Sequence, residues 1–150
     1  MADDRILRGA IVNELWVAFS YAREIAFERL RAVGVDPADY RFLSFVRGLQ
    51  PVTRTTLAQA TGLRRTTLRD AVRPLIERGL MVESPHPTDR RATQLALTPA
   101  GEEILQRGGP VFEEFLRSLD EEVDGKLDEL EQAVWTVRVA LERLAKRQPS

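Results

Sequence analysis

Arginine and threonine side chains are concentrated at the beginning of a predicted helix that spans about residues 65–78. Arginine can donate two hydrogen bonds to guanine O6 and N7, and threonine can contact a phosphate or a thymine methyl group. Positions 65, 66 and 69 share one helix face, and position 73 extends that face by another turn. This chemistry predicts contact with DNA, and the alternative for each arginine is a solvated helix surface. The candidate residues are Arg64, Arg65, Thr66, Thr67, Arg69 and Arg73.

A shorter helix is expected immediately before this one. It spans residues 53–61, where Thr53 can accept hydrogen bonds from the first free amides and Gly62 can end the helix. The longer helix ends at Gly79 and has one apolar stripe for the core. That stripe consists of Leu68, Ala71, Val72, Leu75 and Ile76. A short helix, a tight turn and a longer helix form a helix-turn-helix motif, whose second helix enters the major groove of DNA.

A β-hairpin wing is predicted directly after these helices. Residues 80–83 and 93–97 have the apolar and alternating patterns of short strands, and a polar loop with two prolines connects them. Arg90 and Arg91 at the loop tip are candidates for phosphate and minor-groove contacts, because a narrow minor groove concentrates negative potential. Asp89 is expected to hold an arginine in place, whereas the single histidine of the chain is interpreted as a spectator in this loop. The alternative is an ordinary hairpin loop with a surface ion pair.

Six residues in and after this loop follow the spacing D-x-R-x-x-x-L-x-L-T-x-x-G. They are Asp89, Arg91, Leu95, Leu97, Thr98 and Gly101, and the segment R-G-L-M-V precedes them at residues 78–82. With the helices before it, this pattern resembles the MarR family of bacterial transcriptional regulators, and the resemblance covers essentially the whole chain. It implies a winged helix-turn-helix fold, mainly α with a small β-hairpin, and obligate homodimers built from N- and C-terminal helices.

The resemblance also implies binding to pseudo-palindromic double-stranded DNA, which a small ligand often releases. In the family the arginine two residues after the aspartate, here Arg91, usually enters the minor groove, and Arg90 is the alternative. Two positions depart from the family pattern. Arg64 stands where many relatives have a small capping residue, which predicts a weaker helix start. Pro74 removes one hydrogen bond inside the recognition helix, which predicts a kink near Asp70 to Pro74 and no break.

The segments that flank the winged helix are expected to be long helices. In residues 5–34, apolar residues recur every three or four positions, in a helix too long for one small core. Asp36 and Pro37 predict the start of a helix that runs to about residue 48. Another helix begins after Thr98, must bend or be interrupted at Gly108-Gly109-Pro110, and is followed by a helix over about residues 120–145.

Surplus apolar surface on the terminal helices predicts a homodimer. The last helix has apolar residues at alternating intervals of three and four, as in a helix-packing seam. The alternative is that each helix packs only within its own chain. We expect one domain over residues 1–150, with a winged-helix core at about 36–98 and dimerisation helices at about 5–34 and 99–147. The dimerisation candidates are Leu7, Ile11, Leu127, Leu130, Val134, Val137, Leu141 and Leu144.

The charge of the chain is unevenly distributed, although its net value is only −1. Residues 47–98 have 9 basic and 4 acidic side chains, whereas residues 99–150 have 7 and 12. A phosphate-facing surface and a remote one would differ in this way, and chance variation is the alternative. The absence of cysteine excludes disulfides and thiolate zinc sites, and no apolar run approaches the roughly 18 residues of a membrane span. We expect a cytoplasmic protein without membrane contact.

Five aromatic residues of the first two predicted helices are candidates for contact with an effector. The resemblance implies that these helices line a cleft for a small aromatic or anionic molecule, and the alternative is plain core packing. The residues are Trp16, Phe19, Tyr40, Phe42 and Phe45.

The leading hypothesis is a homodimeric, ligand-responsive repressor that binds an operator. The alternative is a winged helix that uses the same surface to bind another protein. An enzyme is disfavoured, because the chain has no cysteine, no glycine-rich phosphate loop and one histidine, which lies in the wing. We therefore expect no catalytic residues, no metal and no cofactor.

Overall fold

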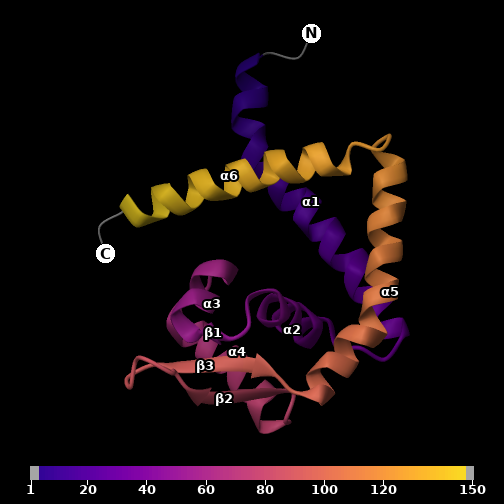
Figure 1. The fold of residues 1–150 in the computed structure, drawn as a ribbon. Coiled ribbons are helices and arrows are strands. Elements are labelled where there is room, and N and C mark those ends of the chain that lie inside the picture. Colours follow the sequence, from indigo (N-terminus) through magenta and orange to yellow (C-terminus); the bar gives the residue numbers. More distant parts are fainter. Residues whose placement is uncertain (1–3, 148–150) are drawn as a thin grey trace.

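The molecule consists of a head, which contains the winged helix, and an arm of long helices (Figure 1). The computed structural model describes residues 4–147, and for residues 4–9 the helical backbone alone. The arm comprises α1 (Asp4–Ala32), α5 (Pro99–Glu122) and α6 (Leu127–Arg147). The head comprises α2 (Pro37–Leu49), β1 (Val52–Thr53), α3 (Arg54–Thr61), α4 (Arg65–Glu77), β2 (Met81–Pro85) and β3 (Thr93–Leu97). This architecture confirms the predicted fold class.

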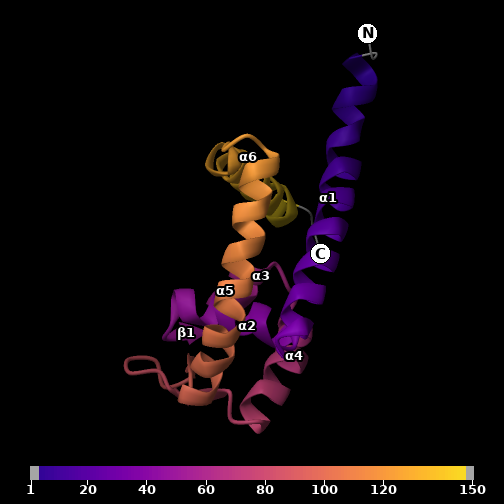
Figure 2. The ribbon, with the colours of Figure 1, turned by 90° about the vertical axis from the view of Figure 1, so that its right-hand side faces the viewer.

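The arm meets the head at one end. Helices α1 and α5 lie side by side next to α2 and separate with distance from the head (Figures 1 and 2). Helix α6 turns away from the far end of α5 and none of its residues is buried. Among residues 4–147, no helix has the length and hydropathy needed to cross a lipid bilayer.

The strands form one antiparallel sheet in the order β1-β3-β2. The hairpin pairs Met81 with Leu97 at its base and Pro85 with Thr93 near the loop, as the alternating pattern predicts. On the other edge, Val52 pairs with Leu95. The sequence did not predict β1, because a strand of two residues has no periodicity.

The helix boundaries follow the capping residues. The Asp36 carboxylate accepts hydrogen bonds from the N–H groups of Ala38 and Asp39, and the Thr53 hydroxyl accepts one from Thr56 N–H. Both caps confirm the predicted starts of α2 and α3. Arg64 precedes α4 without a side-chain cap hydrogen bond, and the weaker helix start expected from this stays a prediction.

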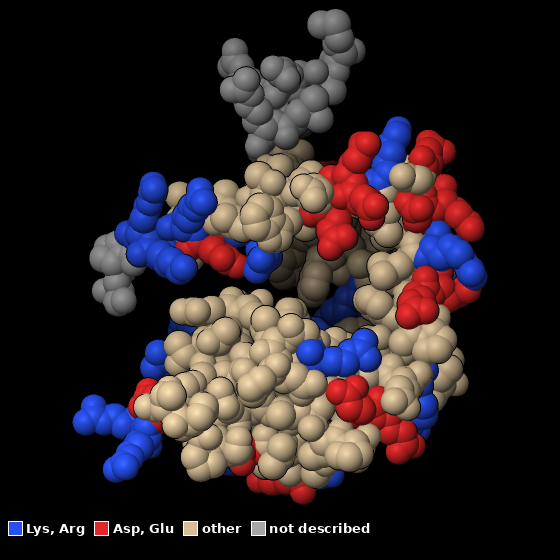
Figure 3. Space-filling model, viewed as in Figure 1, with Lys and Arg blue, Asp and Glu red and all other residues tan. Residues whose placement is uncertain are grey.

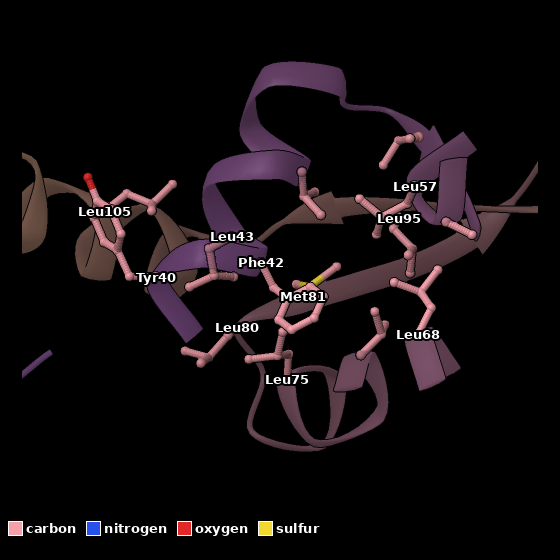
Figure 4. Packing of buried hydrophobic residues seen from close by; sticks show 14 of the residues in the cluster. Tyr40, Phe42, Leu43, Leu57, Leu68, Leu75, Leu80, Met81, Leu95 and Leu105 are labelled. Atoms are coloured by element: carbon pink, nitrogen blue, oxygen red, sulfur yellow. The ribbon is translucent and has the colours of Figure 1, made fainter. Parts of the chain in front are cut away.

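The core of the head lies between α2, α3, α4 and the sheet (Figure 4). The predicted stripe of the recognition helix points into it, with Leu68, Val72 and Leu75 almost fully buried. These residues meet apolar side chains of the other head elements and of α5. They include Leu43, Val46, Leu57, Met81, Leu95 and Leu105.

The boundary between α5 and α6 differs from the prediction. The sequence predicts a helix from about residue 120, but α5 continues to Glu122 and α6 begins at Leu127. Asp124 and Gly125 have φ values of 55° and 73°, which end the helix, and Gly125 N–H donates to the Asp120 carbonyl at 2.8 Å. Helix α5 contains Pro110 without an interruption. Figure 1 shows that the helix changes direction along its length, so the expected bend is confirmed.

Candidate nucleic-acid interface

Helix α4 presents the predicted arginine and threonine residues to solvent. Arg64 to Thr67, Arg69 and Arg73 are exposed, and the helix buries only its opposite face. Arg69 and Asp70 approach to 3.7 Å, and so do Arg73 and Glu77, with all four side chains at least 66% exposed. Such loose pairs leave the guanidinium groups available to a ligand.

The helix remains continuous through Pro74, as predicted. Its last turn is fixed by Arg78, whose backbone N–H and Nε both donate to the Pro74 carbonyl, at 3.0 and 3.2 Å. The same guanidinium makes two hydrogen bonds of 2.6 and 2.8 Å to Asp39, whose side chain is 12% exposed. This contact joins the end of α4 to the start of α2, and it raises the pKa of Arg78 above its usual value.

The wing loop is closed by hydrogen bonds of its own residues. Asp89 Oδ1 accepts from the backbone N–H of Arg91 at 2.9 Å, and the Asp89 carbonyl accepts from Ala92 N–H at 3.0 Å. Asp89 therefore holds Arg91 in place, as expected, but it does so by accepting a hydrogen bond from the backbone of Arg91. In the described part of the chain, Asp89 forms no ion pair with a guanidinium. The side chains of Arg90 and Arg91 extend into solvent.

His86 has a structural part in this loop, so its interpretation as a spectator is corrected. Its Nδ1 accepts hydrogen bonds from the N–H groups of Asp89 at 3.1 Å and Thr88 at 3.3 Å. Its backbone N–H donates to the Ala92 carbonyl at 3.0 Å. The imidazole thus caps the turn from which Arg90 and Arg91 project, and the sequence pattern alone carried no signal for it.

An ion pair connects the wing with the helix-turn-helix. Arg54, the first residue of α3, donates from Nε and Nη2 to the two carboxylate oxygens of Glu83 in β2, at 2.9 and 3.0 Å. The hydroxyl of Thr93 in β3 donates to the same carboxylate. These hydrogen bonds lower the pKa of Glu83 below its usual value. The pair was missed from the sequence, because its partners are 29 residues apart.

The two candidate DNA-contacting elements frame a common hollow of about 550 Å³. The start of α4 lies on one side, and the first residues of α3 and the base of the wing lie on the other. The lining residues are Arg54, Thr55, Arg65, Thr66, Leu68, Arg69 and Glu83. Figure 3 shows basic side chains projecting at the wing and acidic ones gathered near the junction of α5 and α6, as the uneven charge of the sequence predicts.

A second cavity, of about 530 Å³, lies where α1, α2 and α5 meet. Of the five predicted effector residues, Tyr40 and Phe45 line it. Phe42 is 6% exposed and belongs to the core, while Trp16 and Phe19 lie in the solvent-exposed part of α1, outside this cavity. Two of the five candidates thus line this cavity, and the contact of any of them with an effector stays a prediction. The lining is Ala26, Phe27, Leu30, Pro37, Tyr40, Arg41, Ser44, Phe45, Arg47 and Phe112.

The predicted dimerisation residues lie on the outer parts of the arm. Ile11, Leu130, Val134, Leu141 and Leu144 are 46–55% exposed. Leu127 and Val137 are half-buried, and the side chain of Leu7 lies outside the described residues. All of these positions lie on α1 or α6 of the arm. Their contact with a second copy of the chain stays a prediction.

A helix pair with an exposed basic face and a basic wing beside it is the arrangement of a winged helix-turn-helix. Residues 33–92 match the model of the MarR family. A putative transcriptional regulatory protein for the hcr operon of Thauera aromatica is 26% identical over 132 residues, covering 85% of this chain and 77% of the relative. Over residues 33–92 the chain is therefore similar to the MarR family of transcriptional regulators.

Solved structures share the fold. Staphylococcus aureus MarR in complex with salicylate and kanamycin has a TM-score of 0.72 at 17% identity, covering 95% of both chains. The S. aureus MepR–DNA complex has a TM-score of 0.71 at 18% identity, covering 85% of this chain and 96% of the other.

Among the described residues, no group of three or more histidine, cysteine or acidic side chains is arranged to hold a metal ion.

Proposed function

We propose that this protein is a cytoplasmic, homodimeric repressor that binds a pseudo-palindromic operator in double-stranded DNA. The observation that carries the proposal is the pairing of an exposed arginine face on α4 with an arginine-tipped wing on the same head. In such an arrangement α4 reads base edges in the major groove, through Arg65, Thr66 and Arg69. The wing reaches the adjacent minor groove with Arg91 or Arg90. The MepR–DNA complex supports this comparison at the level of fold.

Two copies are required for a palindromic site, and the arm supplies the surface for them. Apolar side chains on α1 and α6 are about half exposed, among them Ile11, Leu130 and Leu141. Many large apolar side chains exposed on the terminal helices are typical of a subunit interface. A dimer would present two α4 helices to successive major grooves, about 34–36 Å apart along the duplex.

The experiment that tests DNA binding is selection of fragmented DNA from the source genome by the purified protein. We expect enrichment of a few fragments that contain an inverted repeat with half-sites about one helical turn apart. Fluorescence anisotropy with excess random DNA then separates specific from general attraction to phosphate. No enrichment, or equal affinity for all sequences, would contradict the proposal and favour the protein-binding alternative.

We also propose that the cavity between α1, α2 and α5 takes a small aromatic carboxylate that weakens operator binding. Tyr40, Phe45 and Phe112 provide apolar and aromatic contacts, and Arg41 and Arg47 provide cationic groups for a carboxylate. A related fold is known with salicylate, in S. aureus MarR. Salicylate should release the selected operator and raise the melting temperature, and Arg47→Gln should reduce both effects. Operator binding that is insensitive to salicylate and other benzoates would contradict this assignment.

A further inference from the structure

The wing is joined to the helix-turn-helix by one polar contact that spans three elements. Arg54 begins α3, Glu83 lies in β2 and Thr93 lies in β3, opposite Pro85. The two N–H···O distances between Arg54 and Glu83 are 2.9 and 3.0 Å, in the parallel, bidentate geometry that fixes the relative orientation of both groups. The contact thus restrains the direction in which the wing leaves the head.

The contact also lies on the surface that would face DNA. Glu83 and Arg54 line the same hollow as Arg65, Thr66 and Arg69 of the recognition helix. Adjacent major and minor grooves are separated by one sugar–phosphate strand, so a duplex bound by both α4 and the wing has that strand near this hollow. An acidic side chain is unexpected next to phosphates, and its presence calls for a function other than attraction.

The guanidinium of Arg54 is occupied by Glu83 and is not presented to a phosphate. Nε and Nη2 are directed to Glu83, and Nη1 is buried with no hydrogen-bond partner among the described residues. The side chains of Arg54 and Glu83 are 34% and 30% exposed, whereas those of Arg69 and Arg73 are 70% exposed. Arg54 therefore differs from the arginines that can contact DNA directly.

We propose that Arg54 and Glu83 are positioning residues for operator recognition. Their ion pair, supported by Thr93, sets the angle of the wing relative to α4, so that Arg91 and Arg69 reach neighbouring grooves together. The inference rests on the proposed DNA-binding function and adds a specificity determinant that contacts no base.

The direction in which Glu83→Gln changes the affinity for the operator distinguishes a positioning role from simple electrostatics. Glu83→Gln removes a negative charge beside the duplex, which by charge alone strengthens binding to every sequence. If Glu83 acts by holding the wing, the same change weakens binding to the selected operator about three- to tenfold, as loss of a partly exposed ion pair does. Affinity for random DNA should stay equal or rise, so the ratio of the two affinities falls.

Asp70→Asn is the matched control. It removes an equal charge from an exposed side chain of α4 whose only ion pair among the described residues is the loose one with Arg69. This variant should bind operator and random DNA at least as tightly as the wild type. Both affinities are measured by fluorescence anisotropy near physiological salt, with dimerisation checked by sedimentation and folding by circular dichroism.

A double variant in which the two charged residues exchange places tests whether the contact between them is needed for operator binding. Arg54→Glu and Glu83→Arg should each weaken operator binding, and the double variant should recover at least half of the loss on a logarithmic scale. Thr93→Val, at an exposed position of the hairpin, removes one hydrogen bond to Glu83 and should give a smaller loss in the same direction. It keeps the test decisive where a charge variant fails to fold.

The outcomes separate this inference from the proposed function. If the wild-type protein selects no DNA, the proposed function fails and this inference fails with it. If the wild type binds its operator and folded Glu83→Gln binds as tightly or more tightly, the positioning role is overturned while the proposed function stands. Reduced operator affinity without any recovery in the exchanged pair also overturns it, because the charges would then act independently.

Discussion

Replacement of Gly108 by alanine should destabilise the protein, although alanine favours helices. Gly108 lies inside α5, where this helix passes close to α1 and α2. A Cβ atom there would lie 2.4 and 2.5 Å from two ring carbons of Tyr40 and 3.0 Å from Leu30 Cδ2. Tyr40 is 8% exposed and its ring packs against Phe112 at a centroid distance of 5.7 Å, so a displaced ring must break this packing and move toward the cavity that it lines.

The size of the effect follows from two opposing terms. An ordinary contact begins at 3.4 Å, so α5 or the tyrosine ring must move by about 1 Å. Overpacking of this kind costs about 1–3 kcal/mol, and the displacement places Gly108→Ala near the upper end of that range. The gain in helix propensity offsets about 0.5–1 kcal/mol. The net loss should be about 2 kcal/mol, or roughly 4–8 °C in melting temperature for a chain of this size.

The assay is urea denaturation at one fixed protein concentration, since association contributes to the stability of an oligomer. Gly48→Ala is the matched control, because Gly48 also lies in a helix but a Cβ atom there would meet no other atom within 4 Å. That variant should be stabilised by up to about 1 kcal/mol. Equal stabilisation of both variants would refute the close approach of α5 to Tyr40.

Three further predictions concern DNA binding and assembly. Arg69→Ala should cost about 1–3 kcal/mol at the selected operator and much less on random DNA, measured by anisotropy; equal losses would make Arg69 a phosphate contact. Arg91→Ala should weaken operator binding and reduce the salt slope by about one unit, with unchanged melting temperature; unchanged affinity would shift the assignment to Arg90. Charged residues at Leu130 and Leu141 should give monomers or unfolded chains, and a well-folded wild-type monomer at micromolar concentration in sedimentation would contradict the homodimer.

The features that the sequence predicted correctly are local. Asp36 and Thr53 begin α2 and α3 because a short polar side chain at these positions accepts hydrogen bonds from free amides two or three residues later. The buried face of α4 follows from periodicity alone, with Leu68 and Val72 in the core. In such cases the interacting groups lie within one or two helical turns, so spacing determines the outcome.

The features that the sequence did not predict depend on residues far apart in the chain. Arg54 and Glu83 are 29 residues apart, and Asp39 and Arg78 are 39 apart, with no pattern that relates them. The positions of the candidate effector residues also depend on distant parts of the chain. Phe42 and Phe45 lie on the same helix, but Phe42 faces the core and Phe45 faces the cavity. Which apolar face of a helix packs and which lines a cavity is decided by the neighbouring helices.

The contacts within the head and those between head and arm differ in kind. Inside the head, bidentate ion pairs fix β2 to α3 and the end of α4 to the start of α2. Between head and arm, the packing beside the cavity is apolar, with Gly108 against Tyr40, and the Gln50 side chain donates one long hydrogen bond of 3.5 Å to Glu102. Directional hydrogen bonds resist rotation, whereas apolar packing without them permits small sliding movements. In the proposed dimer, a molecule that enters this cavity should therefore move each head as one body. The spacing of the two α4 helices would then change, while the shape of each proposed DNA-reading surface would stay the same.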